Sequence, residues 1–115
     1  TSNFKTGDTG NTILAKSLAQ GKAEGLRPSI YTHPLGLYGH SAGPTIGMWD
    51  SQGGVAGTGD YPLYNNTVYA IELNTTVTIP EWNKDIRIML EGAGQWSNDS
   101  FNYVNERQEQ LMLVK

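Results

Sequence analysis

The sequence predicts an α+β fold in which one helix is followed by a β-sheet. Apolar residues recur at helical spacing only near the N-terminus, over residues 10–24. Beyond Pro28 the chain changes to short runs of β-branched and aromatic residues, separated by segments rich in glycine. The length of 115 residues suits one domain, residues 1–115, with a core of moderate size.

The helix is expected over residues 10–24. Its large apolar side chains share one helical face: Ile13, Leu14 and Leu18. Thr9 or Asn11 is available as the N-cap, and Gly25 is a typical C-terminal stop.

The later part of the chain alternates between expected strands and loops. Four runs have the composition of strands, the last of which is equally compatible with a short helix: residues 29–33, 67–79, 85–91 and 108–115. Two segments rich in Gly, Asp, Asn or Ser are expected as loops: residues 50–66 and 92–100. Loops as long as the first are often functional.

Composition excludes several classes of function. A net charge of −3 and a pI near 5.2 provide no basic surface for nucleic acid. No apolar run approaches the roughly 18 residues of a membrane span, and the N-terminus lacks a signal-peptide pattern. We therefore expect a soluble protein, cytoplasmic or exported after signal removal. Because cysteine is absent, a metal site would use imidazole and carboxylate ligands.

Both histidines lie in the segment THPLGLYGHSAGP, seven positions apart. Pro34, Gly36 and Gly39 lie between them and exclude a helix. On an unbroken strand, an odd separation would send the two side chains to opposite faces. A bend must therefore separate His33 from His40 if the two rings converge, and an ordinary exposed loop is the alternative.

Two glutamates interrupt apolar strands. Glu72 lies in VYAIEL, which is apolar on both faces, so we expect it to be buried and protonated, paired with a cation or bound to metal. The alternative is an edge strand with one face exposed to solvent, on which Glu72 would lie. Glu91 shares its strand face with Asp85 and Arg87, so an exposed polar face explains it equally well. Together with His33, these glutamates suit a divalent ion such as Mn, Fe, Co or Zn.

The pattern His33-x-x-Gly36-x-x-x-His40-x-x-x-Pro44, followed by strand glutamates in YAIELN and IRIMLE, resembles the pita-bread metallopeptidase family. This family includes methionine aminopeptidase, aminopeptidase P, prolidase and creatinase, and the chain is most similar to the Xaa-Pro peptidase-like members. The resemblance covers residues 7–114. It implies half of a pita-bread fold, an antiparallel β-sheet with one main N-terminal helix packed on it.

The resemblance also implies a role for each candidate residue. His33 and Glu72 would be metal ligands, and Glu91 would bridge two divalent ions (Mn, Co, Zn or Fe). His40 would be catalytic, contacting the peptide substrate and stabilising an oxyanion, with Tyr38 beside it in substrate binding. The metal-activated water would cleave a peptide bond near the substrate N-terminus, as in an Xaa-Pro aminopeptidase or dipeptidase.

The chain departs from the family pattern at several positions. Pro34 replaces Gly, Ser41 replaces an acidic residue, and Pro44 lies one position late. The family site also uses two upstream aspartates, whereas only Asp8 precedes His33, and it lies in a turn-like segment. We therefore expect the C-terminal half of the catalytic domain, inactive alone and with weak or no metal binding, which self-associates or requires a missing N-terminal half.

Two other classes of function stay open at the level of sequence. One is a pseudoenzyme that keeps the fold without turnover. The other is a non-catalytic β-rich module that binds carbohydrate or protein through aromatic residues in or beside loops: Trp49, Tyr61, Trp82 and Trp96.

Overall fold

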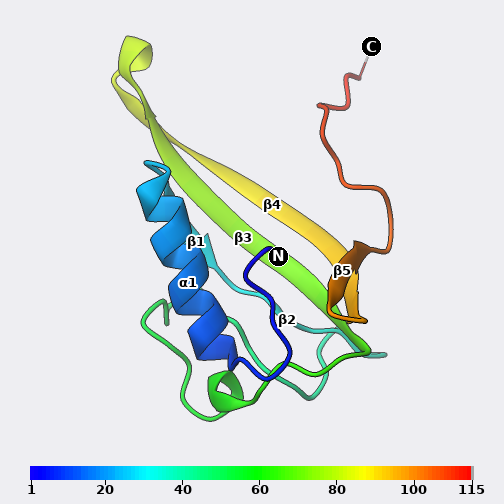
Figure 1. Ribbon diagram of the computed structural model, residues 1–115. Coiled ribbons are helices and arrows are strands. Elements are labelled where there is room, and N and C mark those ends of the chain that lie inside the picture. The colour runs from blue at the N-terminus through cyan, green and yellow to red at the C-terminus, as the bar shows by residue number, and fades with distance from the viewer. Residues whose placement is uncertain (115) are drawn as a thin grey trace.

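The structure, a computed structural model, describes residues 1–114 as one main helix packed on a five-stranded antiparallel sheet (Figure 1). This arrangement confirms the expected α+β class with one main N-terminal helix. The elements, in chain order, are α1 (Gly10–Ala23), β1 (Arg27–Ile30), β2 (His33–Pro34), the 3-10 helix η1 (Thr58–Asp60), β3 (Thr67–Ile79), the 3-10 helix η2 (Pro80–Trp82), β4 (Lys84–Ser97) and β5 (Ser100–Tyr103).

Helix α1 begins and ends close to the positions that its sequence predicts. Thr9 is the N-cap, because its side-chain oxygen accepts a hydrogen bond from the backbone N–H of Thr12 at 3.1 Å. Gly25, with φ +78°, follows the last turn. Over residues 1–114, no helix has both the length and the apolar character needed to cross a membrane.

Strand β3 is the centre of the sheet. It pairs with β1 and β2 along one edge and with β4 along the other, always antiparallel. β1 and β2 share one register on β3, with Arg27 opposite Thr76 and His33 opposite Ala70. In place of the one strand expected over residues 29–33, the structure has two short strands, β1 and β2, which pair with β3 in the same register.

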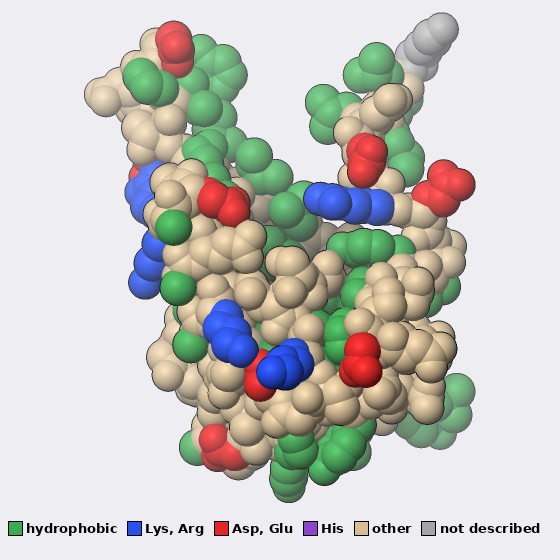
Figure 2. Space-filling view, viewed as in Figure 1, with side chains coloured by type: hydrophobic (Ala, Val, Ile, Leu, Met, Phe, Trp, Pro, Cys, Tyr) green, Lys and Arg blue, Asp and Glu red, His purple; other side chains and the backbone are tan. Residues whose placement is uncertain are grey.

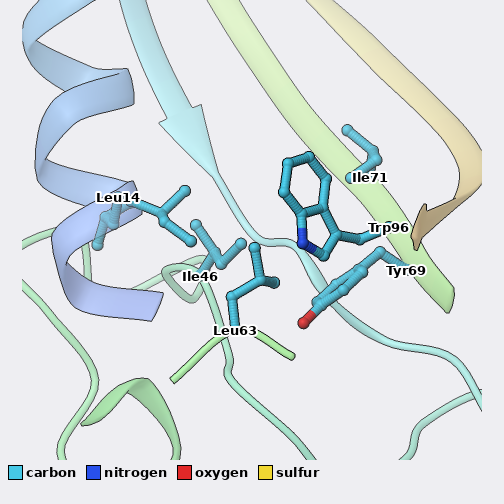
Figure 3. Close-up of a cluster of buried hydrophobic side chains, with 7 residues drawn as sticks. Leu14, Ile46, Leu63, Tyr69, Ile71 and Trp96 are labelled. Carbon is cyan, nitrogen blue, oxygen red and sulfur yellow. The ribbon is translucent and has the colours of Figure 1, made fainter. Parts of the chain in front are cut away.

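The core lies between α1 and one face of the sheet. Leu14 projects from the helix, Ile71 and Tyr69 from β3 and Trp96 from β4, while Ile46 enters from a connecting segment (Figure 3). These side chains are at most 8% exposed. Because side chains alternate along a strand, β3 turns its odd-numbered residues toward the helix and its even-numbered residues to the other face.

Two expectations about the C-terminal third are wrong. Residues 108–114 form neither a strand nor a helix, and Lys115 lies outside the described residues. Residues 92–97, expected in a loop, belong to β4, so the turn is confined to Asn98 and Asp99, which both have positive φ. Trp96 is consequently buried, and it cannot serve as an exposed aromatic of a carbohydrate-binding surface.

A side-chain clamp connects the two outer strands of the β1–β3–β4 ladder. The guanidinium of Arg27 on β1 donates two hydrogen bonds, at 2.8 and 2.7 Å, to the carboxylate of Asp85 on β4. The hydroxyl of Thr78 on β3 donates a third at 2.7 Å. The bonds from Arg27, and secondly from Thr78, lower the pKa of Asp85 from 3.8 to about 2.

We expect Asp85→Asn to lower the melting temperature at neutral pH. Because the pKa of Asp85 is depressed in the folded state, its carboxylate stabilises the fold above pH 3.8, and this contribution disappears as pH falls toward about 2. Thermal unfolding of the wild type and of Asp85→Asn between pH 7 and pH 2 should therefore converge, with Glu81→Gln as the control. A melting difference that is independent of pH would contradict the prediction.

We expect Tyr69→Phe to stabilise the protein. The hydroxyl of Tyr69 is buried and makes no hydrogen bond of standard geometry among residues 1–114; burial raises its pKa, and a weaker interaction with the Thr67 side chain lowers it. Removal of an unsatisfied buried hydroxyl should raise the free energy of unfolding by about 1 kcal/mol. Urea unfolding of the variant measures the change, and a lower midpoint would show that this hydroxyl has a partner in solution.

Candidate functional site

The candidate site lies on the sheet face opposite α1. Residues directly opposite one another in an antiparallel ladder share a face, so the pairing of β1, β3 and β4 arranges side chains in rows. We name three of them the carboxylate row (Tyr31, Glu72, Glu91), the middle row (Ser29, Asn74, Met89) and the arginine row (Arg27, Thr76, Arg87). Neither histidine is visible from the helix side of the molecule (Figure 2).

His33 lies one step beyond the carboxylate row, opposite Ala70, and its ring reaches Glu72 diagonally. Its Nε2 is 2.8 Å from Oε1 of Glu72, and its Nδ1 is 3.0 Å from the carbonyl oxygen of Pro34. The His33 side chain is 7% exposed and that of Glu72 34%. Glu72 is therefore half-buried rather than buried as the sequence predicted.

Both ring nitrogens of His33 thus face oxygen atoms. A carbonyl oxygen and an ionised carboxylate are acceptors only, whereas a neutral imidazole carries a single N–H. One nitrogen would be left facing an acceptor without a hydrogen. At 2.8 Å, Nε2 of His33 and the carboxylate oxygen of Glu72 leave no room for a metal ion between them, but an ion beside the pair could be bound by both atoms.

The chain bends back after Pro34, so that the His40 ring lies beside the His33 ring. The loop from Pro34 closes with the N–H of Ser41 donating to the carbonyl of Pro34 at 3.0 Å, and Gly39 supplies a positive φ of +93°. The rings of His33 and His40 stack with centroids 3.9 Å apart. This geometry confirms that a bend separates the two histidines and that they converge.

His40 has its own partner. Its Nε2 lies 3.1 Å from the hydroxyl of Tyr31, whose ring centroid is also 5.2 Å from that of His33. The two Nε2 atoms therefore face different groups, one a carboxylate and the other a phenol. Tyr38, predicted to bind substrate, is 92% exposed and forms a β-bridge with His40.

Glu91 lies directly opposite Glu72 and is exposed. Its strand neighbours Asp85, Arg87 and Met89 on the same face are exposed too, as the alternative interpretation of this strand predicted. Within residues 1–114, no three His, Asp or Glu side chains are grouped closely enough to hold a metal ion. The structure thus joins His33 to Glu72 and places Glu91 beside them without completing a three-ligand group.

A cleft of about 360 Å³ opens over the rows. Its lining combines the two glutamates with apolar and polar side chains: Ser29, Tyr31, Trp49, Glu72, Leu73, Asn74, Arg87, Met89, Leu90 and Glu91. Trp49, which is 76% exposed, comes from the segment that follows the second histidine. Of the four aromatic residues considered for a carbohydrate surface, only Trp49 borders this cleft.

Sequence reasoning missed Tyr31 and Arg87. Tyr31 lies two residues before His33, on the same side of a strand that continues in register, and this spacing was the available signal. Arg87 was assigned only to an exposed polar face. Its position two rows from Glu72 depends on the β3–β4 register, which no local pattern reveals.

Searches of protein-family models, curated proteins and solved structures found no match to this chain. The function therefore has to be inferred from the geometry and from the motif.

We expect Tyr31→Phe to release His40 while leaving the contact between His33 and Glu72 intact. The variant keeps the aromatic ring but removes the hydroxyl that lies 3.1 Å from His40 Nε2. Long-range ¹H–¹⁵N NMR of the imidazoles should show an altered tautomer distribution for His40 alone. Tyr38→Phe is the matched control, since the Tyr38 side chain is almost fully exposed. Unchanged His40 signals in Tyr31→Phe would contradict the assigned hydrogen bond.

Proposed function

We propose that this chain is part of a metal-dependent hydrolase, to which it contributes His33, Glu72 and Glu91 as ligands. The observation that carries the proposal is the contact of His33 Nε2 with the Glu72 carboxylate while Nδ1 faces a backbone carbonyl. Metal-binding histidines usually donate the other ring N–H to such a carbonyl, which directs the lone pair at the ligand.

The donor set fits a divalent cation. Two carboxylates directly opposite each other in a ladder repel, and a shared cation would remove this repulsion. A cation at Nε2 of His33 would also satisfy the two acceptors that face the ring. Imidazole with carboxylates suits Mn, Fe, Co or Zn. Two such ions would supply a hydroxide nucleophile and polarise the bond to be cleaved.

Three ligands are too few for two metal ions, so the proposal includes further carboxylates. Asp8 is not a candidate, because its carboxylate forms an ion pair with Lys16 on α1. The resemblance to the pita-bread metallopeptidases supports two aspartates from another segment or another chain. Alone, the described residues should therefore bind metal weakly.

The other residues of the site suit peptide hydrolysis. His40, held by Tyr31 and exposed to solvent, can donate a hydrogen bond to the oxygen of a bound carbonyl as negative charge develops there. Trp49 and Met89 offer apolar surface for substrate side chains. The resemblance to Xaa-Pro peptidases favours substrates with proline at the second position.

We expect the chain to bind Co²⁺ weakly and Glu72→Gln to weaken this binding further. Loss of a group that supports or holds a metal usually reduces affinity at least about tenfold. Titration of Co²⁺, followed by its visible absorption, measures the affinity of the wild type, Glu72→Gln and the control Glu81→Gln, whose side chain lies in η2. Absence of binding, or equal affinity in all three proteins, would contradict the ligand role of Glu72.

Activity distinguishes an enzyme from a pseudoenzyme. The chain, alone and joined to any segment encoded before Thr1, would be assayed on Xaa-Pro peptides with Mn²⁺ or Co²⁺. Metal-dependent cleavage that His40→Ala abolishes supports a peptidase. Metal binding without cleavage in the longer protein would identify a pseudoenzyme and contradict the hydrolase.

A further inference from the structure

We propose that the outer edge of β4 is a dimerisation surface, on which residues 87–91 pair antiparallel with the same residues of a second copy of this chain. The two-fold axis passes beside Met89. The inference is independent of the proposed function, because it requires neither a metal ion nor the contact of His33 with Glu72.

Most of the outer edge of β4 has no neighbouring strand. In the part of the chain that the structure describes, β5 pairs only with residues 94–97, at one end of β4 (Figure 1). The N–H of Val104 donates one further hydrogen bond to this edge, to the carbonyl of Ala93 at 2.9 Å. Residues 84–92 are therefore open to another strand on this side.

The unpaired backbone groups of this edge belong to alternate residues. Along a strand, the N–H and C=O groups of successive residues point to opposite sides, and the carbonyl of Ala93 points away from β3. Arg87, Met89 and Glu91 therefore also direct their backbone groups outward, whereas the even-numbered residues between them bond to β3. The outward groups form a regular row of donors and acceptors.

The side chains of residues 87–91 are suited to pairing with a copy of themselves. Ile88, Met89 and Leu90 are 46%, 67% and 51% exposed. Arg87 and Glu91 flank them, and neither forms an ion pair within residues 1–114. A charge on an edge strand normally opposes pairing. Here two opposite charges lie at equal distances from Met89, so they become complementary when two copies pair.

An axis beside Met89 matches both the charges and the backbone groups. It places Arg87 opposite Glu91 of the second copy, twice, and Ile88 opposite Leu90, also twice. Residues directly opposite each other share a sheet face, so the charged pairs and the apolar pairs lie on opposite faces. Outward-directed residues face one another in this register. Arg87, Met89 and Glu91 can thus each donate and accept one backbone hydrogen bond across the interface.

Other two-fold registers are less favourable. An axis at Arg87 or at Glu91 places that residue opposite its own copy, which brings like charges together. An axis at Ile88 places Asp85 opposite Glu91. An axis at Leu90 leaves Arg87 without a charged partner. Charge complementarity therefore selects the axis beside Met89.

The C-terminal residues of the same chain fit this edge less well. If they continued the pairing of β4 with β5, in which Gly94 lies opposite Tyr103, Glu106 would lie directly opposite Glu91. Like charges in such positions destabilise a sheet. A second copy avoids this repulsion and forms the self-complementary contact that is typical of a symmetric dimer.

Sedimentation equilibrium of charge-reversed variants tests the register. The contact is small, so the wild type should dimerise reversibly and only at high protein concentration. Arg87→Glu and Glu91→Arg should each weaken the homodimer about tenfold, because two complementary pairs become repulsive. An equimolar mixture of these two variants should associate again, since both pairs are complementary in the mixed dimer. Met89→Lys should also weaken the dimer, whereas Lys84→Glu, outside the paired residues, should not.

Amide hydrogen exchange followed by NMR tests the same contact without substitution. The N–H groups of Arg87, Met89 and Glu91 should become protected as the protein concentration rises. Those of Ile88 and Leu90 already bond to β3 in the monomer and serve as internal controls, with protection that does not depend on concentration.

Three results would overturn the proposal. The first is a wild type that stays monomeric at the concentrations used for NMR. The second is protection of the outward N–H groups in the monomer, which would show that the chain's own C-terminal residues cover the edge. The third is a dimer that is unaffected by the charge reversals but is lost in Leu111→Gln or Leu113→Gln, since both leucines are exposed outside the sheet.

Discussion

The site depends on one constraint, the pairing of residues 31 and 32 with Glu72. The N–H of Tyr31 donates to the carbonyl of Glu72 at 2.9 Å, and the Thr32 hydroxyl lies 3.3 Å from the N–H of Glu72. This pairing fixes the register of the chain before His33 on β3. Because Tyr69 and Ile71 hold β3 in the core, a slip of one residue in the short segment would turn the His33 side chain to the helix face and take the imidazole away from the Glu72 carboxylate.

Local patterns in the sequence predicted the positions of α1 and β3, but they did not predict where β4 ends. Helix α1 and strand β3 were predictable because the large apolar residues of α1 share one face, β3 is rich in β-branched and aromatic residues, and the neighbours of both are caps or turn residues. Strand β4 continues through Gly92 and Gly94, which composition assigns to a turn. A Cβ at Gly94 would lie 2.3 Å from the ring of Phe101, so glycine serves here for close packing against β5. Only the tertiary contact distinguishes this use of glycine from a turn.

The candidate site was predictable in its residue types but only partly in its geometry. The residues between His33 and His40 required a bend if the rings converge, and the stacked rings follow from it. The opposition of Glu72 and Glu91 depends on the connection between β3 and β4, where Asn83 adopts φ +46° after η2. A different turn length would shift this register. The same turn sets the distance of Arg87 from the glutamates, so the cleft could not be derived from strand patterns alone.

Two kinds of unfavourable contact in this structure would be removed by binding: close acceptor groups by a cation, and exposed apolar side chains by a partner protein. A bound cation would remove the repulsion between Glu72 and Glu91. It would also bind Nε2 of His33, whose two ring nitrogens both face oxygen atoms. Hydrophobic side chains are exposed on the hairpin of β3 and β4 (Figure 2). They include Ile88 and Leu90, and another protein surface would cover them. β5 covers the outer edge of β4 only over residues 94–97. Leu90 pairs with Leu73 and lies on the helix side of the sheet, whereas Glu91 lies on the opposite face, so a partner that both covered Leu90 and supplied carboxylates near Glu91 would have to extend around this open edge of β4.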